Sequence, residues 1–486
     1  MAYGSDEELR HLFRRAGFGT GPAEIEVYRD MRPRDLVPML LGFEDVPDTV
    51  DAKIGQPDYA RVMVRGEFKP NTSITDARQR WLFRMLHTER PLQEKLALFW
   101  HNHFATAYSK VAGAYGSSDG TRLLAAKASE DPVRQEGQVE LIRRMCLAPF
   151  DELLVAMAKD PAMLIWLDGR FNTRARPQEN FGRELMELFT MGVDLYVEAD
   201  VYAAARVFTG WNLRRTTAGA GDPSPKYEFT YNSAQHDTTA KTFSFPVYPD
   251  GGRTIPARSA ADGIEDGLDL IRAVASHPDT ARRLASRLYG YFVSEINAPD
   301  QRFIDELAAT YLQSNLSLRA LVGRLLRSEP FADPANYFTR YSWPVEFAIR
   351  AVKELGWIGF NVNDIVNALV NMGQQLFEPP DVAGWELGAG WISSGAMLAR
   401  ANFASTLTSN QRTNLLATAR PHGQTADTLL AFMLDRLSPA PFEPRAYDDL
   451  RAYVTSAAWT GSDTQIRNKA AGLAHLILGS GEYVFV

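Results

Sequence analysis

Residues 76–106 decide the fold, and they read DARQRWLFRMLHTERPLQEKLALFWHNHFAT. Large apolar side chains recur here at spacings of three and four, the period of an amphipathic helix: Trp81, Leu82, Met85, Leu86, Leu92, Leu96, Phe99, Trp100 and Phe104. Pro91 interrupts the run, and proline lacks the N–H that a helix interior needs. The stretch therefore predicts two apolar helices joined at Pro91.

The same period continues through most of the chain. It recurs in residues 139–159, 179–191, 199–211, 260–276, 279–294, 300–311, 317–327, 344–355, 363–372, 396–408, 424–437, 447–458 and 463–478. Because strands would show a period of two instead, these runs predict a mainly α, large multi-helix globular fold.

One segment departs from this pattern. Residues 214–258 are rich in glycine and proline and contain alternating, β-type stretches at 227–231 and 242–245. They predict an irregular loop with a short β-hairpin, inserted between helices. We therefore expect an N-terminal helical part (1–213) that carries the polar motifs, this insertion (214–258), and a C-terminal helical part (259–486) that packs with the first as one unit.

Composition excludes several classes of protein. The 486 residues include 52 Lys and Arg against 59 Asp and Glu, a net charge of −7, and 45% are hydrophobic. Disordered, collagen-like and coiled-coil chains have other compositions, and an acidic chain is a poor partner for nucleic acid. The single cysteine, Cys146, excludes an internal disulfide and a cysteine-rich metal site.

No apolar run reaches the roughly 20 residues that span a bilayer, so we expect no membrane span. The first ten residues are polar and show no export signal, which predicts a cytoplasmic protein as the sequence is written. An exported mature form, with its signal removed, stays open.

A polar stripe lies on the otherwise apolar segment ENFGRELMELF (179–189). At 3.6 residues per turn, Asn180, Arg183, Glu184 and Glu187 share one helix face. Carboxylates three residues apart have Cβ atoms about 5–6 Å apart, close enough for an acid/base pair or a shared metal ion. The plainer alternative is a solvated face with an Arg183–Glu187 ion pair.

Other polar residues occur in apolar surroundings. His101 and His103 flank Asn102, but residues two apart on a helix point in different directions and cannot both bind one ion there. Arg206 lies in an alanine-rich helix with Trp211 after it, and we expect its partner to be Glu184 or Glu187. Asp200, near the start of that helix, is expected to cap it or to interact favourably with its dipole.

The insertion contributes the dipeptide His236-Asp237. Functional side chains are common on loops, so His236 is a candidate to close over a substrate. Asp237 has a plainer alternative, which is that its side chain only helps to turn the chain.

These stretches resemble the bacterial family catalogued as domain of unknown function 1800 (DUF1800). The likeness rests on HLFRRAGFG (11–19), WHNHF (100–104), ENFGRELMELFT (179–190), FEPPDVAGW (377–385) and shorter matches between them, with Gln178 and Met191 as mild departures. The resemblance implies one large, mainly helical unit from a bacterium, with no agreed activity. Members are often exported and occur beside sulfatase-like proteins, which implies work on envelope or extracellular polymers.

The first functional hypothesis is a hydrolytic enzyme acting on a glycan or other polar substrate, since paired carboxylates suit that chemistry. The expected catalytic residues are Glu184, Glu187, His101 and His236. The expected substrate-binding residues are Asn180, Arg183, Arg206, Asp237 and Trp211. No residue is assigned to a metal, no cofactor is evident, and a small molecule or glycan is the expected partner.

Two alternatives stay open. One is a metal-dependent enzyme in which a divalent ion takes mixed His and Glu ligands, His101 or His103 together with Glu184, Glu187 or His236. The other is a non-catalytic binding or scaffold protein whose polar residues form a buried salt-bridge network. Convergence of these residues on an open pocket favours an enzyme, whereas sealed and fully paired side chains favour a scaffold.

Overall fold

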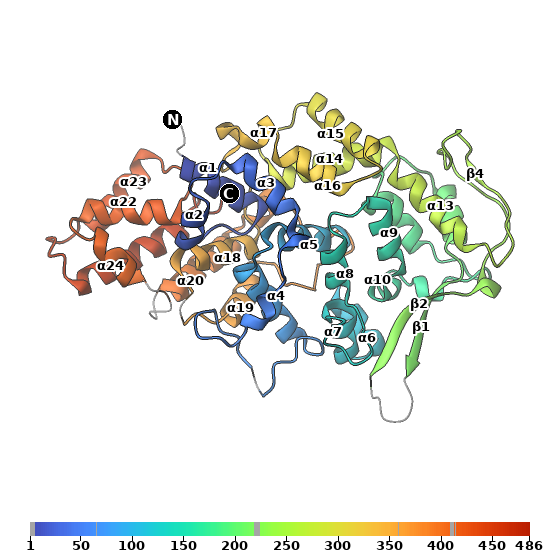
Figure 1. Cartoon of the computed structure of the whole chain (residues 1–486), viewed down its shortest axis with the longest axis horizontal. Helices are drawn as coiled ribbons and strands as arrows, with labels where there is room; N and C mark the ends of the chain where they lie inside the picture. The colour runs from blue at the N-terminus through green and yellow to red at the C-terminus, as the bar shows by residue number, and fades with distance from the viewer. Residues whose placement is uncertain (1–4, 65, 218–223, 358, 409–412, 414) are drawn as a thin grey trace.

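The fold is mainly α-helical, as predicted, and includes two small two-stranded sheets (Figure 1). The computed structural model describes residues 5–64, 66–217, 224–357, 359–408, 413 and 415–486. In the described residues no helix is both long and apolar enough to cross a membrane.

The helices of the first half are α1 (Ser5–Ala16), α2 (Pro22–Tyr28), α3 (Pro33–Leu41), α4 (Ile74–His87), α5 (Pro91–His103), α6 (Tyr108–Tyr115), α7 (Ser117–Ala125), α8 (Gln138–Met145), α9 (Phe150–Lys159), α10 (Pro161–Trp166), α11 (Asn180–Glu184) and α12 (Glu198–Val207). Those of the second half are α13 (Ile264–Ala275), α14 (Pro278–Phe292), α15 (Gln301–Gln313), α16 (Leu318–Leu326), α17 (Glu329–Ala332), α18 (Pro344–Leu355), α19 (Asn363–Asn371), α20 (Ser394–Thr408), α21 (Leu415–Ala419), α22 (Ala426–Leu437), α23 (Pro444–Val454) and α24 (Asp463–Leu478).

The expected break at Pro91 is confirmed, because α4 ends at His87 and α5 begins at Pro91. The side chain of Ser73 accepts a hydrogen bond from the Asp76 N–H and caps the start of α4. Beyond its first residue, α5 is buried along its whole length. Such a helix forms part of the core, so every polar side chain on it needs a partner inside the protein.

The expected hairpin is also present, but it begins earlier than the sequence predicted. Strand β1 (Trp211–Thr217) pairs antiparallel with β2 (Pro225–Tyr231), with Trp211 opposite Tyr231, and β3 (Lys241–Thr242) pairs with β4 (Thr254–Ile255). Residues 218–223, within the expected insertion, lie outside the described residues. The predicted strand at 242–245 is limited to Lys241 and Thr242.

The insertion is bound to the helical body by side chains from α7 and α12. The Tyr227 hydroxyl donates to Asp119 at 2.6 Å, and the Ser244 hydroxyl and N–H donate to Asp200 at 2.5 and 2.7 Å. Asp200 also accepts the Val197 N–H at 2.8 Å, which confirms its expected role as a cap of α12. The insertion is therefore part of the packed structure.

Contacts between distant parts of the sequence join the two helical halves. From α1, His11 bonds the carbonyl of Phe331 at 3.0 Å, and Arg15 donates to the carbonyl of Asn336 at 2.9 Å. Figure 1 places α4, α5 and α18 in the middle of the molecule, the group α22, α23 and α24 at one end, and the β1–β2 hairpin at the other.

A buried ion cluster lies where α5 meets α18. Arg340 donates to both oxygens of Glu346, at 3.0 and 2.9 Å, and Lys95 from α5 donates to the same carboxylate. Burial alone would raise the pKa of Glu346, but Arg340 and Lys95 bring it below its usual value. Burial lowers the pKa of Lys95 to about 7 despite its partner. Glu346 is thus the shared carboxylate partner of two basic side chains that have no access to water.

Glu346→Gln should therefore destabilise the protein strongly, because it removes the carboxylate that the buried side chains of Lys95 and Arg340 both contact. Removing one partner of a buried pair costs about 3–5 kcal/mol, which urea unfolding would measure. The matched control is Asp427→Asn, which breaks the exposed 2.9 Å pair with Arg451 and should leave the free energy of unfolding nearly unchanged. Equal effects of the two substitutions would contradict a structural role for Glu346.

Candidate functional site

The polar stripe lies where a regular helix widens. α11 (Asn180–Glu184) continues directly into η4 (Leu185–Phe189), a single π-helical turn, where the sequence predicted one regular helix. The Thr190 hydroxyl donates to the Leu185 carbonyl at 2.6 Å and closes the wide turn. Single π turns inside helices are rare and frequently mark functional sites.

Close packing on α12 fixes the position of α11. A Cβ atom on Gly182 would lie 2.7 Å from the Cβ of Ala204, so only glycine permits this approach of the two helices. The widened turn is held at its other end by α5 and α14. Arg283 donates to the carbonyls of Leu188 and Thr190 at 2.5 and 3.2 Å, and His103 bonds the Phe189 carbonyl at 3.1 Å.

Three consecutive side chains at the end of α5 each hold a backbone group of another segment. His101 Nε2 accepts the Phe377 N–H at 3.2 Å, Asn102 Oδ1 accepts the Trp385 N–H at 2.7 Å, and His103 donates to Phe189. Burial lowers the pKa of His101 to about 3, and burial with nearby arginines lowers that of His103. Both imidazoles are therefore neutral at physiological pH, and each has a backbone partner.

Glu184 differs from the other members of the stripe. It is half-buried and has neither a hydrogen bond nor an ion pair with any residue that the structure describes. Burial, reinforced by the neighbouring charge of Glu187, raises the pKa of Glu184 to about 6. Glu187 accepts a hydrogen bond from the Tyr196 hydroxyl. One carboxyl of the pair thus lacks a partner and titrates close to neutrality, while the other is fixed by a hydroxyl.

Arg183 and Asn180 border this pair on its exposed side. The guanidinium of Arg183 binds both oxygens of Glu198, at 2.7 and 3.1 Å, and so does not form the Arg183–Glu187 pair of a simple solvated face. Asn180 is exposed and its amide donates to Asp168 at 3.4 Å. Lys110 donates to the same carboxylate at 3.0 Å, and nothing in the sequence near Lys110 indicated this.

The remaining candidates form a separate cluster. Arg206 binds Asp237 at 2.8 Å, so the expectation that Glu184 or Glu187 would be its partner is wrong. His236 has no exposed surface and lies between the Thr209 carbonyl, at 2.9 Å, and Asp266 on α13, at 3.2 Å.

Two cations complete this cluster around Asp266. Lys241 and Arg258 both bind its carboxylate, and the Lys241 ammonium is itself fully buried. The cluster is therefore internally paired, and its ion pairs join the insertion to α13.

Trp211 is buried between Phe208 and Phe229, with ring centroids 5.2 and 5.1 Å away.

The ligands expected for a metal site are not brought together. Among the residues that the structure describes, no three His, Cys, Asp or Glu side chains are arranged to hold a metal ion. His101, His103 and His236 each bond a different segment. The alternative of mixed His and Glu ligands therefore gains no support from the geometry.

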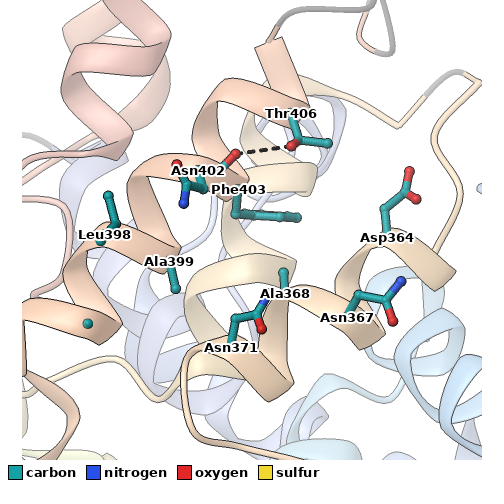
Figure 2. Close-up of a pocket in the computed structure, with 10 residues that line it drawn as sticks. Asp364, Asn367, Ala368, Asn371, Leu398, Ala399, Asn402, Phe403 and Thr406 are labelled. Carbon is teal, nitrogen blue, oxygen red and sulfur yellow. Dashed lines mark hydrogen bonds between the residues drawn. The ribbon is translucent and has the colours of Figure 1, made fainter.

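A polar groove of about 410 Å³ lies elsewhere, between α19 and α20 (Figure 2). Its lining includes Asn367 and Asn371 on one helix and Asn402 and Thr406 on the other. Thr406 donates to the Asn402 carbonyl at 3.0 Å within α20. Because only these two helices line the groove, the Glu184–Glu187 pair does not belong to it.

Comparison with known proteins identifies one relationship. The model of a family described as protein of unknown function (DUF1800) matches residues 11–485. No curated protein and no solved structure gives a significant match. The match covers α5, the widened turn and the insertion alike.

Glu184→Gln should stabilise the protein at about pH 8 and not at about pH 4. Since the folded pKa of Glu184 is about 6 against an ordinary 4.5, the folded state binds more protons between these values, and stability falls as pH rises through them. Glutamine cannot ionise and escapes this loss. Melting temperatures across pH measure the effect, with Glu179→Gln, an exposed neighbour, as control. A gain that does not depend on pH would contradict the raised pKa.

Proposed function

Because the chain belongs to the DUF1800 family, whose description assigns no activity, we propose a function from the geometry: a hydrolytic enzyme in which Glu184 and Glu187 are the acid and the base. The observation that carries the proposal is the half-buried carboxyl of Glu184, which has a pKa of about 6 and no described partner. Two neighbouring carboxyls with different environments are the usual means of dividing acid and base roles.

Glu184 is the proton donor in this proposal. A pKa near 6 keeps part of the population protonated close to neutral pH, and a carboxyl without a partner is free to meet a leaving-group oxygen. Glu187 is the base or nucleophile, and the Tyr196 hydroxyl fixes its orientation. Glu184 ends α11 and Glu187 lies in the widened turn that follows, whose end Arg283 and His103 hold.

The exposed surroundings of the pair suit a polar substrate such as a glycan. Asn180, Asp168 and Lys110 present donors and acceptors next to one another, and the Lys110 ammonium lies 5.5 Å from the centre of the Trp166 ring. Sugars bind through such combinations of an aromatic surface and hydrogen-bonding side chains. Arg183 contributes a cation beside Glu198.

The other predicted site residues act at a distance in this proposal. His101, His236, Arg206, Asp237 and Trp211 position α5, the insertion and β1, and they do not touch the substrate. The ion pair of Arg206 with Asp237 and the buried, hydrogen-bonded His101 and His236 are the part of the structure that resembles the scaffold alternative. The unpaired Glu184 is what favours an enzyme over a scaffold.

Hydrolysis should depend on both carboxyls and on the protonation of Glu184. Release of reducing ends from a panel of soluble polysaccharides measures activity, and both Glu184→Gln and Glu187→Gln should reduce it by about 100-fold or more. The rate should fall as pH rises above about 6, because the proton donor is then ionised.

Glu179→Gln serves as the control, because it removes an exposed carboxylate from the same segment and should retain activity. If a hydrolysable substrate is found and Glu184→Gln cleaves it at the wild-type rate, the proposal is wrong. Loss of activity accompanied by unfolding would instead assign both carboxyls a structural role.

A further inference from the structure

A cavity of about 490 Å³ lies between α5, α14 and the loop that follows α14. Phe99 and Asn102 line it from α5, Arg287 and Gly290 from α14, and residues 294–299 from the loop. Ligand sites in proteins usually occupy 300–1,000 Å³ and combine apolar walls with a few polar groups. Neither Glu184 nor Glu187 lines this cavity, so it is distinct from the proposed hydrolytic site.

Arg287 is a cation for which the described residues supply no counter-ion. Its guanidinium has no hydrogen bond or ion pair within the described ranges, and the charge that acts on it most is the like charge of Arg283, one turn away. Burial, with Arg283, lowers the pKa of Arg287 to about 10. The group therefore stays charged at neutral pH, with its donors available to an oxyanion.

Asn102 supplies a second donor on the same cavity. Its side chain is 2% exposed, and its Oδ1 is committed to the Trp385 N–H. Its Nδ2 has no acceptor in the part of the chain that the structure describes. A buried amide normally has a partner, so an acceptor on a ligand would complete this one.

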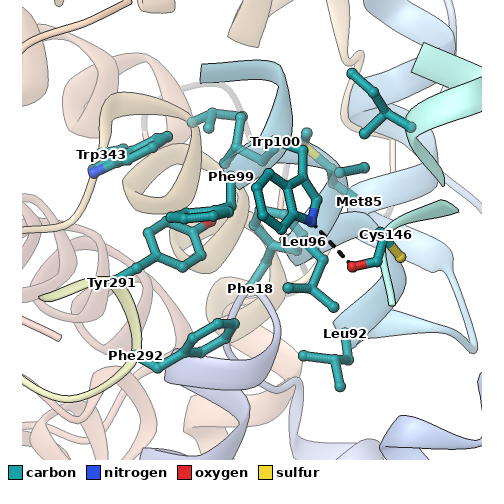
Figure 3. Close-up of a cluster of buried hydrophobic side chains, with 14 of the residues drawn as sticks. Phe18, Met85, Leu92, Leu96, Phe99, Trp100, Cys146, Tyr291, Phe292 and Trp343 are labelled. Atoms are coloured by element: carbon teal, nitrogen blue, oxygen red, sulfur yellow. Dashed lines mark hydrogen bonds between the residues drawn. The ribbon is translucent and has the colours of Figure 1, made fainter. Parts of the chain in front are cut away.

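Aromatic rings form one wall of the cavity. Tyr291 lies between Phe99 and Trp343, with ring centroids 5.1 and 5.2 Å away, and Figure 3 shows the three side chains next to one another. Such a wall favours an apolar or ring-shaped body over a small inorganic ion.

Glu295 gives the cavity a negative group as well. Its two oxygens accept the N–H groups of Tyr341 and Gly388, at 2.9 and 3.0 Å, and burial raises its pKa. A carboxylate in the lining disfavours ligands of high negative charge, so a single negative charge matches the lining best.

Gly290 keeps the cavity open. A Cβ atom at this position would meet nothing within 4 Å, whereas one on Gly267 of α13 would lie 2.4 Å from the Trp211 ring. Glycine inside a helix costs about 1 kcal/mol relative to alanine. At Gly267 close packing explains the glycine, and at Gly290 the open volume is what a side chain would fill.

We propose that this cavity binds a small organic monocarboxylate, with the carboxylate on Arg287, a second acceptor on Asn102 and an apolar or aromatic body against Phe99, Tyr291 and Trp343.

Phenylacetate is the probe, and isothermal titration calorimetry measures its binding to the full-length protein. Phenyl phosphate tests whether a dianion binds, and benzyl alcohol tests whether an uncharged ligand binds. Both should bind more weakly than phenylacetate. Arg287→Gln should weaken phenylacetate binding by about tenfold or more. The matched control, Arg282→Gln, removes an exposed arginine of the same helix that pairs with Asp305 at 2.9 Å, and binding should not change.

Gly290→Leu tests the location, because its side chain would enter the cavity and should abolish binding while the melting temperature is retained. Arg287→Gln should also retain the melting temperature, since no described contact is lost. Wild-type protein that fails to bind phenylacetate at about 10 mM overturns the proposal. So does equal binding of benzyl alcohol, equal binding by the two arginine variants, or unchanged binding in Gly290→Leu. Stronger binding of phenyl phosphate than of phenylacetate would indicate that the ligand is a phosphate ester, and it would overturn the assignment of a monocarboxylate.

Discussion

The carboxylate of Glu346 is the interaction on which the central structure depends. It binds both Lys95 of α5 and Arg340, two buried residues that lie far apart in the chain. Taking three charges out of water is favourable only when their geometry satisfies them all. The cluster therefore fixes the position of α5 relative to α18. Because α5 is one continuous helix, the same contact also positions the side chains further along it.

The end of α5 connects the buried ion cluster to the candidate site. His101, Asn102 and His103 hold Phe377, Trp385 and Phe189 through backbone hydrogen bonds. Three stretches that carry the family resemblance, 100–104, 179–190 and 377–385, thus meet at one place. The histidines that suggested metal chemistry act here as donors and acceptors for backbone groups, and His103 in particular fixes the end of the widened turn that bears Glu187.

Local spacing predicted what depends on local interactions. The break at Pro91, the hairpin and the capping role of Asp200 follow from the conformational limits of proline, from alternating residues and from a carboxylate near a helix start. The prediction that a glutamate of the stripe pairs with Arg206 was wrong because the actual partner, Asp237, lies 31 residues away in the chain. Helix periodicity gives no information about contacts at that separation. The same reason hid the bond between His236 and Asp266. The sequence did contain a signal for Arg287, namely two arginines four residues apart, followed by a glycine, on an amphipathic helix.

Glu184 and Arg287 are only partly buried, and neither has a hydrogen bond or an ion pair within the described residues, which is what gives them their weight. Glu94, which unlike them is fully buried, is bound by Arg84, Arg143 and the Trp81 indole, and its pKa falls below the usual value. Burial raises the pKa of both Glu184 and Glu94. At Glu184 no nearby cation is strong enough to offset burial, so its pKa stays above the usual value. Glu94 and Glu346, deep in the core, have cationic partners, whereas Glu184, at the surface end of a widened helix, has none among the described residues. At neutral pH the ionised Glu184 destabilises the folded state, and no contact among the described residues offsets this loss. Such a pattern is expected where a side chain serves a ligand or a reaction.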